Sequence, residues 1–240
     1  MSKYVYTYRL TCFNGAAPCY DNNRLSLAIC KRDMRRVIGN RFFNKKEEKP
    51  EIWMIGFVGK ALAANEQFKG RADQVLYIAR VTDVIDYHDC FGKDISKERT
   101  DNIYIPCDET STHPDFKSGG QWFRHISEST IHTEEWLQQR DFDITHTNSR
   151  KYVLLSDEYT FTNADESKEI RNLIINNDSI VLGTKKAIPT GIGHCWFSDD
   201  TESVISVLRR ITQTTKKLLP EDIDIKKCGP CCGDKREDTI

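Results

Sequence analysis

The sequence predicts an α+β protein in which a curved, mostly antiparallel sheet or a small barrel is flanked by helices. Segments with the alternating or continuous apolar pattern of strands dominate the first half of the 240-residue chain. Segments with the spacing of amphipathic helices lie mostly in the second half, and we find no internal repeat. Strands followed by helices, rather than strict alternation of the two, are typical of α+β folds.

The first strand is expected at residues 4–13, where tyrosines alternate with other residues at a period of two. Asn14-Gly15 ends this strand, and Pro18 delays the next one. Residues 52–58, IWMIGFV, are almost wholly apolar, which favours a strand buried on both faces. The other expected strands are residues 25–30, 74–86 and 152–155.

Three helices are expected, at residues 133–140, 165–176 and 201–218. The last has the clearest pattern, with an apolar stripe at a spacing of three to four and Pro220 directly after it. Residues 87–120 are polar and rich in loop-forming residues, so we expect a functional or mobile loop there. We assign residues 1–219 to a single domain and residues 220–240 to a polar, cysteine-containing and flexible tail.

Composition excludes some functional classes. The formal net charge is −1, so contact with a nucleic acid needs a local basic patch rather than a global field. No apolar run is long enough for a membrane span, and we expect no membrane partner. The N-terminus leads into a strand and lacks the apolar block of a signal peptide. We therefore expect a cytoplasmic protein whose nine cysteines are reduced.

The strongest candidate site begins with a basic cluster that follows residues 25–30. It contains Lys31, Arg32, Arg35 and Arg36. Arginine presents paired N–H donors that match phosphate oxygens, so these residues are candidates for binding a phosphate. A solvated surface turn explains the same charge run equally well.

The loop before the cluster, NGAAPCYDNN at residues 14–23, supplies small residues and hydrogen-bonding side chains. Asn14 and Gly15 would allow a ligand to approach the backbone, and Asp21 and Asn22 would read a base or sugar edge. Cys30 would form part of the wall. An ordinary irregular connection is an equal alternative. The loop lacks the spacing of a Walker or Rossmann motif, so the cofactor stays unknown.

Two residues are candidates for acid–base chemistry. Asp157 ends a predicted strand, although capping a turn is the commoner role for such a residue. His194 precedes Cys195, but adjacent strand residues point to opposite faces, so a structural role is favoured. Trp122 follows Gly119-Gly120 in a polar loop and is the aromatic residue most expected to be exposed and to stack on a base.

The tail contains Cys228, Cys231 and Cys232 in the sequence CGPCC. This spacing is that of a thioredoxin redox pair, but the strand and helix that this chemistry requires are missing around it. Three thiolates are also too few for a structural zinc site. We therefore predict no metal site.

Three segments together resemble a known family. TYRLTCFNGAAPCYDNNRLSLAICKRDMRR, WMIGFVGK and QVLYIARVTDVIDYHDCF with DNIYI resemble the nucleotide-modification-associated domain family of the second type. A later YVLLSDEYTF is similar to its Leu-Leu-Ser-Asp strand. The resemblance covers most of residues 4–197 and is strongest in the first 60. A short second pattern, an apolar strand followed by LYIARV, looks like the sheets of PUA- and EVE-type readers of modified bases.

The family resemblance implies a role in modifying nucleotides in DNA, in bacteria and their phages. The positions that match its pattern are Gly15, Pro18, Asp21, Asn22, Cys30, Lys31, Arg35, Arg36, Gly56, Asp101, Asn102, Tyr104 and Asp157. Asn102 and Tyr104 thereby join the candidate nucleotide-binding residues. The family usually has Gly-Asp before the apolar strand, and here NRFFNKKEEKPE replaces it, which leaves the role of that acidic residue without a counterpart.

Three functional hypotheses follow. In the first, an enzyme binds a nucleotide or DNA, holds a phosphate on Arg35 and Arg36 and uses Asp157 for proton transfer. In the second, a non-catalytic reader admits a modified base to a pocket lined by Tyr8, Trp53 or Trp122. In the third, the protein is an interaction module of a phage or bacterial defence system, with residues 87–120 as an interface for partners encoded nearby.

Overall fold

The computed structural model describes most of the chain, and the statements below concern the part it describes. That part comprises residues 1–21, 23–43, 48–91, 99–107, 122–126, 141–142, 151–176, 187–190, 193–198, 201–214 and 219–224. The side chains of Asp21, His88, Cys90, Pro106, Cys107 and residues 122–124 lie outside that description.

The larger sheet has five strands in the order β10-β5-β4-β1-β11. β1 and β4 run parallel, and the remaining neighbours are antiparallel. The bounds are β1 (Lys3–Leu10), β4 (Glu51–Val58), β5 (Val75–Arg80), β10 (Glu158–Phe161) and β11 (His194–Phe197). All eight residues of β4 are buried, as its apolar sequence predicts.

The smaller sheet has four antiparallel strands in the order β2-β3-β9-β6, and β7 and β8 form a separate pair. The bounds are β2 (Cys19–Asp21), β3 (Arg24–Leu27), β6 (Asp83–Asp86), β7 (Tyr104–Cys107), β8 (Trp122–His125) and β9 (Tyr152–Ser156). The mixed α/β class and the predominance of antiparallel pairs are thus confirmed. The prediction of a small barrel is wrong, because β10 and β11 lie at opposite edges of the larger sheet and do not pair.

One two-stranded ribbon belongs to both sheets. β5 continues into β6, and β9 continues into β10, so β5 pairs with β10 in one sheet while β6 pairs with β9 in the other. The change of partner takes a single residue. The amide of Val81 donates to Ile52 of β4 (2.8 Å), and the amide of Thr82 donates to Leu155 of β9 (2.9 Å).

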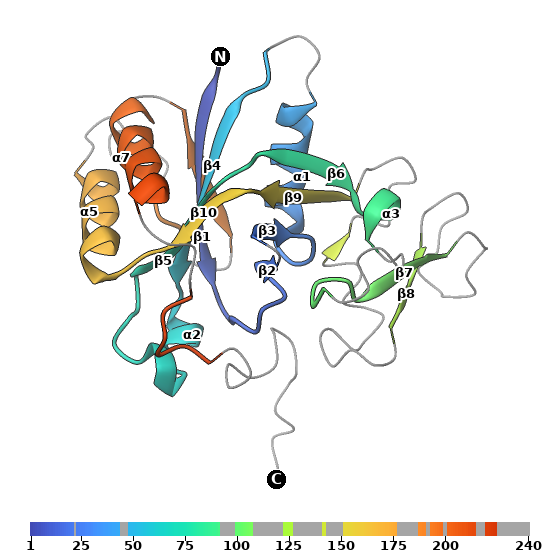
Figure 1. The fold of residues 1–240 in the computed structure, drawn as a ribbon, viewed down its shortest axis with the longest axis horizontal. Helices are drawn as coiled ribbons and strands as arrows, with labels where there is room; N and C mark the ends of the chain where they lie inside the picture. Colours follow the sequence, from blue (N-terminus) through green and yellow to red (C-terminus); the bar gives the residue numbers. More distant parts are fainter. Residues whose placement is uncertain are drawn as a thin grey trace.

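Two helices, α5 (Ala164–Ile175) and α7 (Thr201–Thr214), cover one face of the larger sheet and lie beside each other (Figure 1). A capping box between Asn163 and Glu166 starts α5. The apolar stripe of α7 is buried as predicted, and it packs with the odd-numbered apolar residues of β4. This core contains Val5, Trp53, Ile55, Phe57, Val75, Ile78, Ile170, Ile174, Val204, Ile205, Leu208 and Ile211.

The opposite face of the larger sheet packs against α1 (Arg32–Phe42) and the smaller sheet. The sequence analysis predicted no helix at the basic cluster, so α1 is a difference from our expectation. Gly39 lets α1 approach β9 closely, because a Cβ there would lie 2.3 Å from the ring of Tyr152. Shorter helices are α2 (Lys60–Ala63), the 3₁₀ turn η1 (Glu66–Phe68) and α3 (Tyr87–Cys90).

Several boundaries differ from the sequence prediction. The strand expected at residues 25–30 ends at Leu27, and the strand expected at 74–86 is divided at Val81–Thr82. Residues 220–224, assigned to a flexible tail, pack on the domain, and Ile223 is buried. Cys12 is disulfide-bonded, so the expectation that every cysteine is reduced is wrong there. The helix expected at 133–140 and the CGPCC sequence lie outside the described residues.

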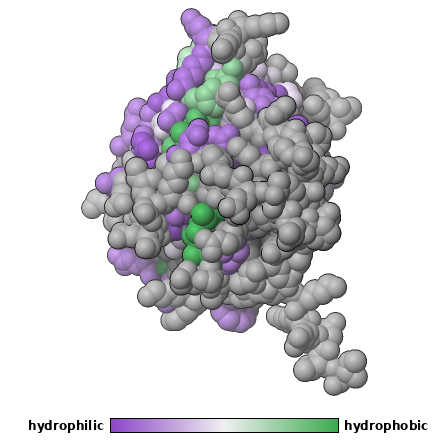
Figure 2. Space-filling view, turned by 90° about the vertical axis from the view of Figure 1, so that its right-hand side faces the viewer, coloured by the Kyte–Doolittle hydropathy of each residue, from purple (hydrophilic) through white to green (hydrophobic). Residues whose placement is uncertain are grey.

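The described surface is mainly hydrophilic on the side that Figure 2 shows, where hydrophobic residues form only narrow bands. Within the described ranges, the exposed large hydrophobic residues are Met1, Phe43 and Ile175. In the same part of the chain, no helix has both the length and the apolar character needed to cross a membrane.

Candidate functional site

The loop at residues 14–18 is folded onto the domain. The side-chain oxygen of Asn14 accepts a hydrogen bond from the amide of Ala16 (3.2 Å), which closes a local turn. Gly15 has a φ of 83°, the left-handed conformation that favours glycine, and is buried. Its carbonyl accepts from the hydroxyl of Thr100 (2.6 Å). The loop is therefore occupied with internal contacts, while the Asp21 side chain and all of Asn22 lie outside the described residues.

A buried polar network joins β3 to residues 99–102. Ser26 donates to the carboxylate of Asp101, and Arg99 donates both to Ser26 Oγ (2.6 Å) and to Asp101 Oδ1 (3.1 Å). Cys19 lies 3.3 Å from the Thr100 hydroxyl. Burial raises the pKa of Asp101, and it raises the pKa of Cys19 to about 11. The thiol is thus held protonated and poorly nucleophilic.

The same segment carries Asn102, which is buried and whose amide donates to the carbonyl of Arg99 (3.1 Å). Sequence reasoning missed Ser26 and Arg99. Ser26 and Arg99 are 73 residues apart, and nothing in the sequence indicates that the fold brings their side chains into contact. The network joins Gly15 and Cys19, both in the predicted loop at residues 14–23, to Thr100, and it joins Ser26 to Asp101.

Arg35 is part of the interior rather than of a phosphate site. It is 2% exposed, and its guanidinium donates to the carbonyls of Cys30 (2.7 Å), Tyr152 (2.7 Å) and Asp141. Burial lowers its pKa to about 10. All three guanidinium nitrogens are engaged with main-chain oxygens. We therefore correct its assignment from phosphate binding to holding α1, β9 and residue 141 together.

Tyr104 and Cys30 belong to the same interior. The carboxylate of Asp141 accepts from the Tyr104 hydroxyl (2.9 Å) and from the amide of Cys30 (2.7 Å). Burial and the charge of Asp141 raise the pKa of Tyr104 far above its ordinary value. Tyr104 is fully buried, so its predicted contact with a nucleotide is not supported by its position. Asp141 was not among the sequence candidates, because the residues around it showed no pattern.

The remaining cations of the cluster lie at the surface, at the start of α1. Cys30 and Lys31 both have positive φ values, 58° and 48°, which turn the chain sharply from β3 into the helix. Lys31 lies over the ring of Tyr8 at 5.3 Å. Arg32 and Arg36 both lie near Asp33, at 3.5 and 3.7 Å. Arg36 is exposed. The carboxylate of Asp33 offsets part of their positive charge.

His194 lies beside this basic group, although 158 residues separate it from Arg36 in the sequence. It pairs with Tyr8 in the sheet, and its ring lies 6.1 Å from that of Tyr6. Burial lowers its pKa; Asp33 opposes this shift, whereas Lys31 and Arg41 add to it. The structure therefore brings together two predicted site segments, residues 31–36 and His194.

A stack of aromatic rings around Arg41 extends the same face. The guanidinium of Arg41 lies 4.1 Å from the ring of Tyr4 and 3.8 Å from that of Trp196, and it donates to the Tyr6 hydroxyl (2.5 Å). Tyr4, Arg41 and Trp196 are each partly exposed. We name the group of Tyr4, Lys31, Arg41, His194 and Trp196, with Arg36 linked to it through Asp33, the basic aromatic face. The sequence analysis did not single out Tyr4 or Arg41 for this site.

Asp157 lies far from that face. It occupies the turn between β9 and β10, where its carboxylate forms an ion pair with Arg24 through two hydrogen bonds of 2.7 and 3.0 Å. β10 and β11 are the two edges of the larger sheet, four strand spacings apart. At about 4.8 Å a spacing, Asp157 and His194 are roughly 20 Å apart along the sheet. The two predicted catalytic residues therefore do not share a site.

The aromatic pocket predicted for a reader does not form from the residues proposed. Tyr8 and Trp53 are both fully buried, and their side chains belong to opposite faces of the larger sheet. The Tyr8 hydroxyl instead pairs with that of Tyr77. The Trp122 side chain lies outside the described part. Among the described residues, no cluster of three or more histidine, cysteine, aspartate or glutamate side chains has the arrangement of a metal site.

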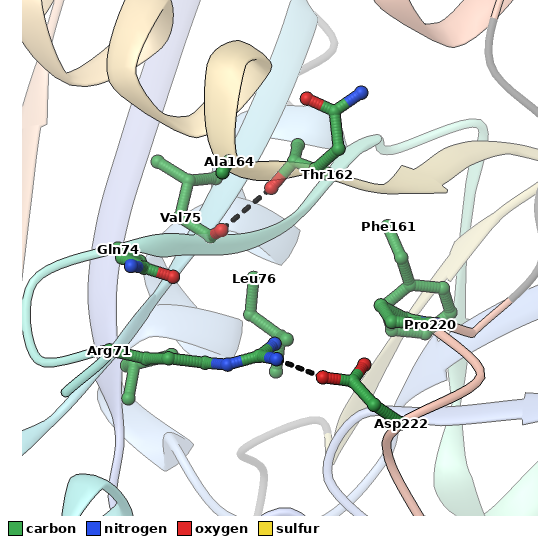
Figure 3. A pocket seen from close by; sticks show the side chains of 11 residues that line it. Arg71, Gln74, Val75, Leu76, Phe161, Thr162, Ala164, Pro220 and Asp222 are labelled. Atoms are coloured by element: carbon green, nitrogen blue, oxygen red, sulfur yellow. Dashed lines mark hydrogen bonds and ion pairs between the residues drawn. The ribbon is translucent and has the colours of Figure 1, made fainter. Parts of the chain in front are cut away.

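A separate cavity of about 550 Å³ lies at the other end of the molecule, between β5, β10, the start of α5 and residues 220–222 (Figure 3). Its lining combines apolar side chains with Arg71, Gln74 and Asp222. No residue of the predicted nucleotide site is among the described residues that line it.

The sequence matches no protein-family model, and it matches neither a curated protein nor a solved structure.

Proposed function

We propose that the protein binds a nucleotide or a nucleic acid strand, with a modified base as the preferred ligand, on the basic aromatic face. The observation that carries this proposal is the stack of Tyr4, Arg41 and Trp196, which His194 connects to the charged groups at the start of α1. Aromatic rings with neighbouring arginines are the combination that binds bases and backbone of single strands.

Each part of the face has a role in this proposal. Lys31 and Arg36 bind phosphate oxygens, for which lysine offers a point charge and arginine a fork of donors. The outer sides of the partly exposed Tyr4 and Trp196 rings stack on a base. His194, whose pKa is lowered mainly by burial, is neutral near pH 7, so one ring nitrogen donates and the other accepts at a base edge.

Binding without catalysis is the version that the geometry favours. The two acid–base candidates lie roughly 20 Å apart by strand spacing. Asp157 is held in an ion pair with Arg24, and Cys19 has a raised pKa. A reader of modified bases, acting with protein partners in a phage or bacterial defence system, agrees with these features. A nucleotide-modifying enzyme is the second candidate, supported by the resemblance described above.

The test measures binding of a fluorescein-labelled single-stranded oligonucleotide by anisotropy at several salt concentrations. Replacing Lys31 and Arg36 together by alanine should weaken binding and reduce the salt slope by about one per lost phosphate contact. Trp196→Leu should weaken binding about tenfold, the effect of losing one stacked base. Oligonucleotides with plain and modified cytosine distinguish a reader from a general binder.

Arg210→Ala is the matched control, because Arg210 lies on α7 and pairs with Glu169 on the helix-covered face. It removes one charge without touching the basic aromatic face, so it should leave affinity unchanged. Equal affinities for wild type, the double variant and Trp196→Leu would refute the proposed face.

A further inference from the structure

The cavity in Figure 3 has the size of a small-molecule site. Its volume of about 550 Å³ lies within the range of roughly 300–1,000 Å³ that such sites have. Its lining comes from four separate parts of the chain, which are the strands β4 and β5, the end of β10 with the start of α5, and residues 220–222. It lies toward the β10 edge of the larger sheet, whereas β11 forms the opposite edge, so a ligand here does not occupy the basic aromatic face.

The lining divides into an apolar part and a polar part. The apolar part consists of Val58, Val75, Leu76, Phe161, Ala164 and Pro220. Two of the polar groups are already used internally: the Thr162 hydroxyl donates to the carbonyl of Val75 (2.6 Å), and the Asn163 side chain accepts from the amide of Glu166 (2.9 Å). Arg71, Gln74 and Asp222 form the rest of the polar part (Figure 3).

Arg71 is paired with Asp222 across the cavity, and the two partners differ in exposure. The guanidinium side chain is 29% exposed, whereas the carboxylate side chain is 58% exposed. An ion pair so accessible to water contributes little net free energy. The carboxylate is therefore the more exposed partner, and Arg71 is the one held closer to the cavity wall.

The segment that carries Asp222 is held by its other residues. Ile223 is buried, and the Gln67 amide exchanges two hydrogen bonds with the main chain of Asp224, of 3.1 and 2.5 Å. Release of Asp222 from Arg71 therefore does not detach residues 220–224 from the domain. A ligand could therefore replace Asp222 as the partner of Arg71 while residues 223 and 224 keep their contacts with the domain.

We infer that this cavity binds a small molecule with one anionic group on an apolar, ring-sized body, and that Asp222 occupies the anion's position when no ligand is bound. The ring packs on Leu76 and Phe161, and the anion takes the donors of Arg71 that Asp222 leaves. The fork of arginine donors fits a carboxylate, sulfonate or phosphate group. A cationic ligand is disfavoured, because it would have to displace Arg71, the less exposed partner.

The experiment uses anilinonaphthalene sulfonate, an anionic aromatic dye that fluoresces when its surroundings are apolar, and the full chain. We expect a single saturable site. Removing a charge-assisted hydrogen bond in Arg71→Ala should weaken binding about tenfold or more. Asp222→Asn should strengthen binding several-fold, because it removes the internal competitor and leaves Ile223 and Asp224 in place. Glu221→Gln is the matched control, and it should bind as the wild type does.

Two further measurements locate the dye. Ala164→Leu places a larger side chain at an exposed helix position in the lining, so it should abolish binding without unfolding the protein. The uncharged analogue phenylnaphthylamine should bind more weakly than the sulfonate. Unchanged dye binding in Ala164→Leu, or equal effects of Asp222→Asn and Glu221→Gln, would overturn the inference, as would equal affinity for the uncharged analogue.

Discussion

The two faces of the five-stranded sheet are built from the same strands but in different ways. β1 presents Val5 to the helix-covered face and Tyr4, Tyr6 and Tyr8 to the other. On the helix-covered face, aliphatic residues of α5 and α7 fill the space. On the other, buried polar groups satisfy one another over long sequence separations, as Arg35 does with Asp141. One interior depends mainly on apolar volume, the other also on a set of specific hydrogen bonds.

The largest expected effect comes from the hydrogen-bonded interior. Arg35→Ala leaves three buried carbonyl oxygens without their donor and opens a void, so it should lower the free energy of unfolding by about 3–5 kcal/mol. Its exposed neighbour supplies the control, since Arg36→Ala should change that free energy by less than about 0.5 kcal/mol. Urea unfolding measures both. Similar losses in the two variants would mean that Arg35 does not hold this interior together.

A smaller loss is expected on the helix-covered face. Leu208→Ala removes a fully buried side chain of α7. It should lower the free energy of unfolding by about 2–4 kcal/mol, because the helix relaxes only partly into the space that the side chain leaves. The adjacent Val207 is only partly buried, so Val207→Ala should cost clearly less. Thermal and urea unfolding of both variants check this order. If Val207→Ala lowered the free energy of unfolding as much as Leu208→Ala does, the buried side of α7 would be assigned wrongly.

The smallest effect distinguishes the two faces by pH. Burial raises the pKa of Asp101, so the stability that its protonated form contributes is present below its ordinary pKa and is lost as pH rises through the raised value. Burial also acts to raise the pKa of Glu51, on the helix-covered face, but hydrogen bonds from Arg209 and Trp53 outweigh it and lower the pKa. Its contribution is present above its ordinary pKa and is lost as pH falls.

Asp101→Asn and Glu51→Gln should therefore have opposite pH profiles. Measured by urea unfolding between about pH 3 and pH 7, the range in which carboxylates titrate, Asp101→Asn should gain on the wild type as pH rises. Glu51→Gln should lose relative to the wild type over the same range. Profiles of the same sign would contradict this assignment of the two carboxylates.

The contrast explains what the sequence could predict. The amphipathic stripe of α7, the apolar β4 and the alternating β1 follow from local periodicity, and the structure has them close to where they were expected. α1 was missed because four of its eleven residues are arginines, which conceal the buried positions Met34 and Ile38. The division at Val81–Thr82 was missed because both halves keep the strand pattern.

The candidate site was predicted only in part. Lys31 and His194 lie near each other, and Arg36 is linked to them through Asp33, although only their chemistry, not their proximity, was readable from the sequence. Arg35 and Arg36 are identical in sequence character, and only the packing of α1 on β9 separates an interior residue from an exposed one. Tyr4 and Arg41 were missed because a stack between a strand and a helix leaves no spacing signal. The cavity beside Arg71 draws on residues 58–222, and no motif marks such a set.

The ribbon formed by β5–β6 and β9–β10 is common to both sheets and connects them covalently. Here the amide of Asp157 donates to the Thr82 hydroxyl (3.1 Å), which fastens the two bends to each other at the point where the ribbon passes between the sheets. Continuous backbone therefore joins β5 and β10, which line part of the cavity, to β6 and β9, and α1 packs against β9. The cavity and α1 are thus attached to the two ends of one continuous ribbon.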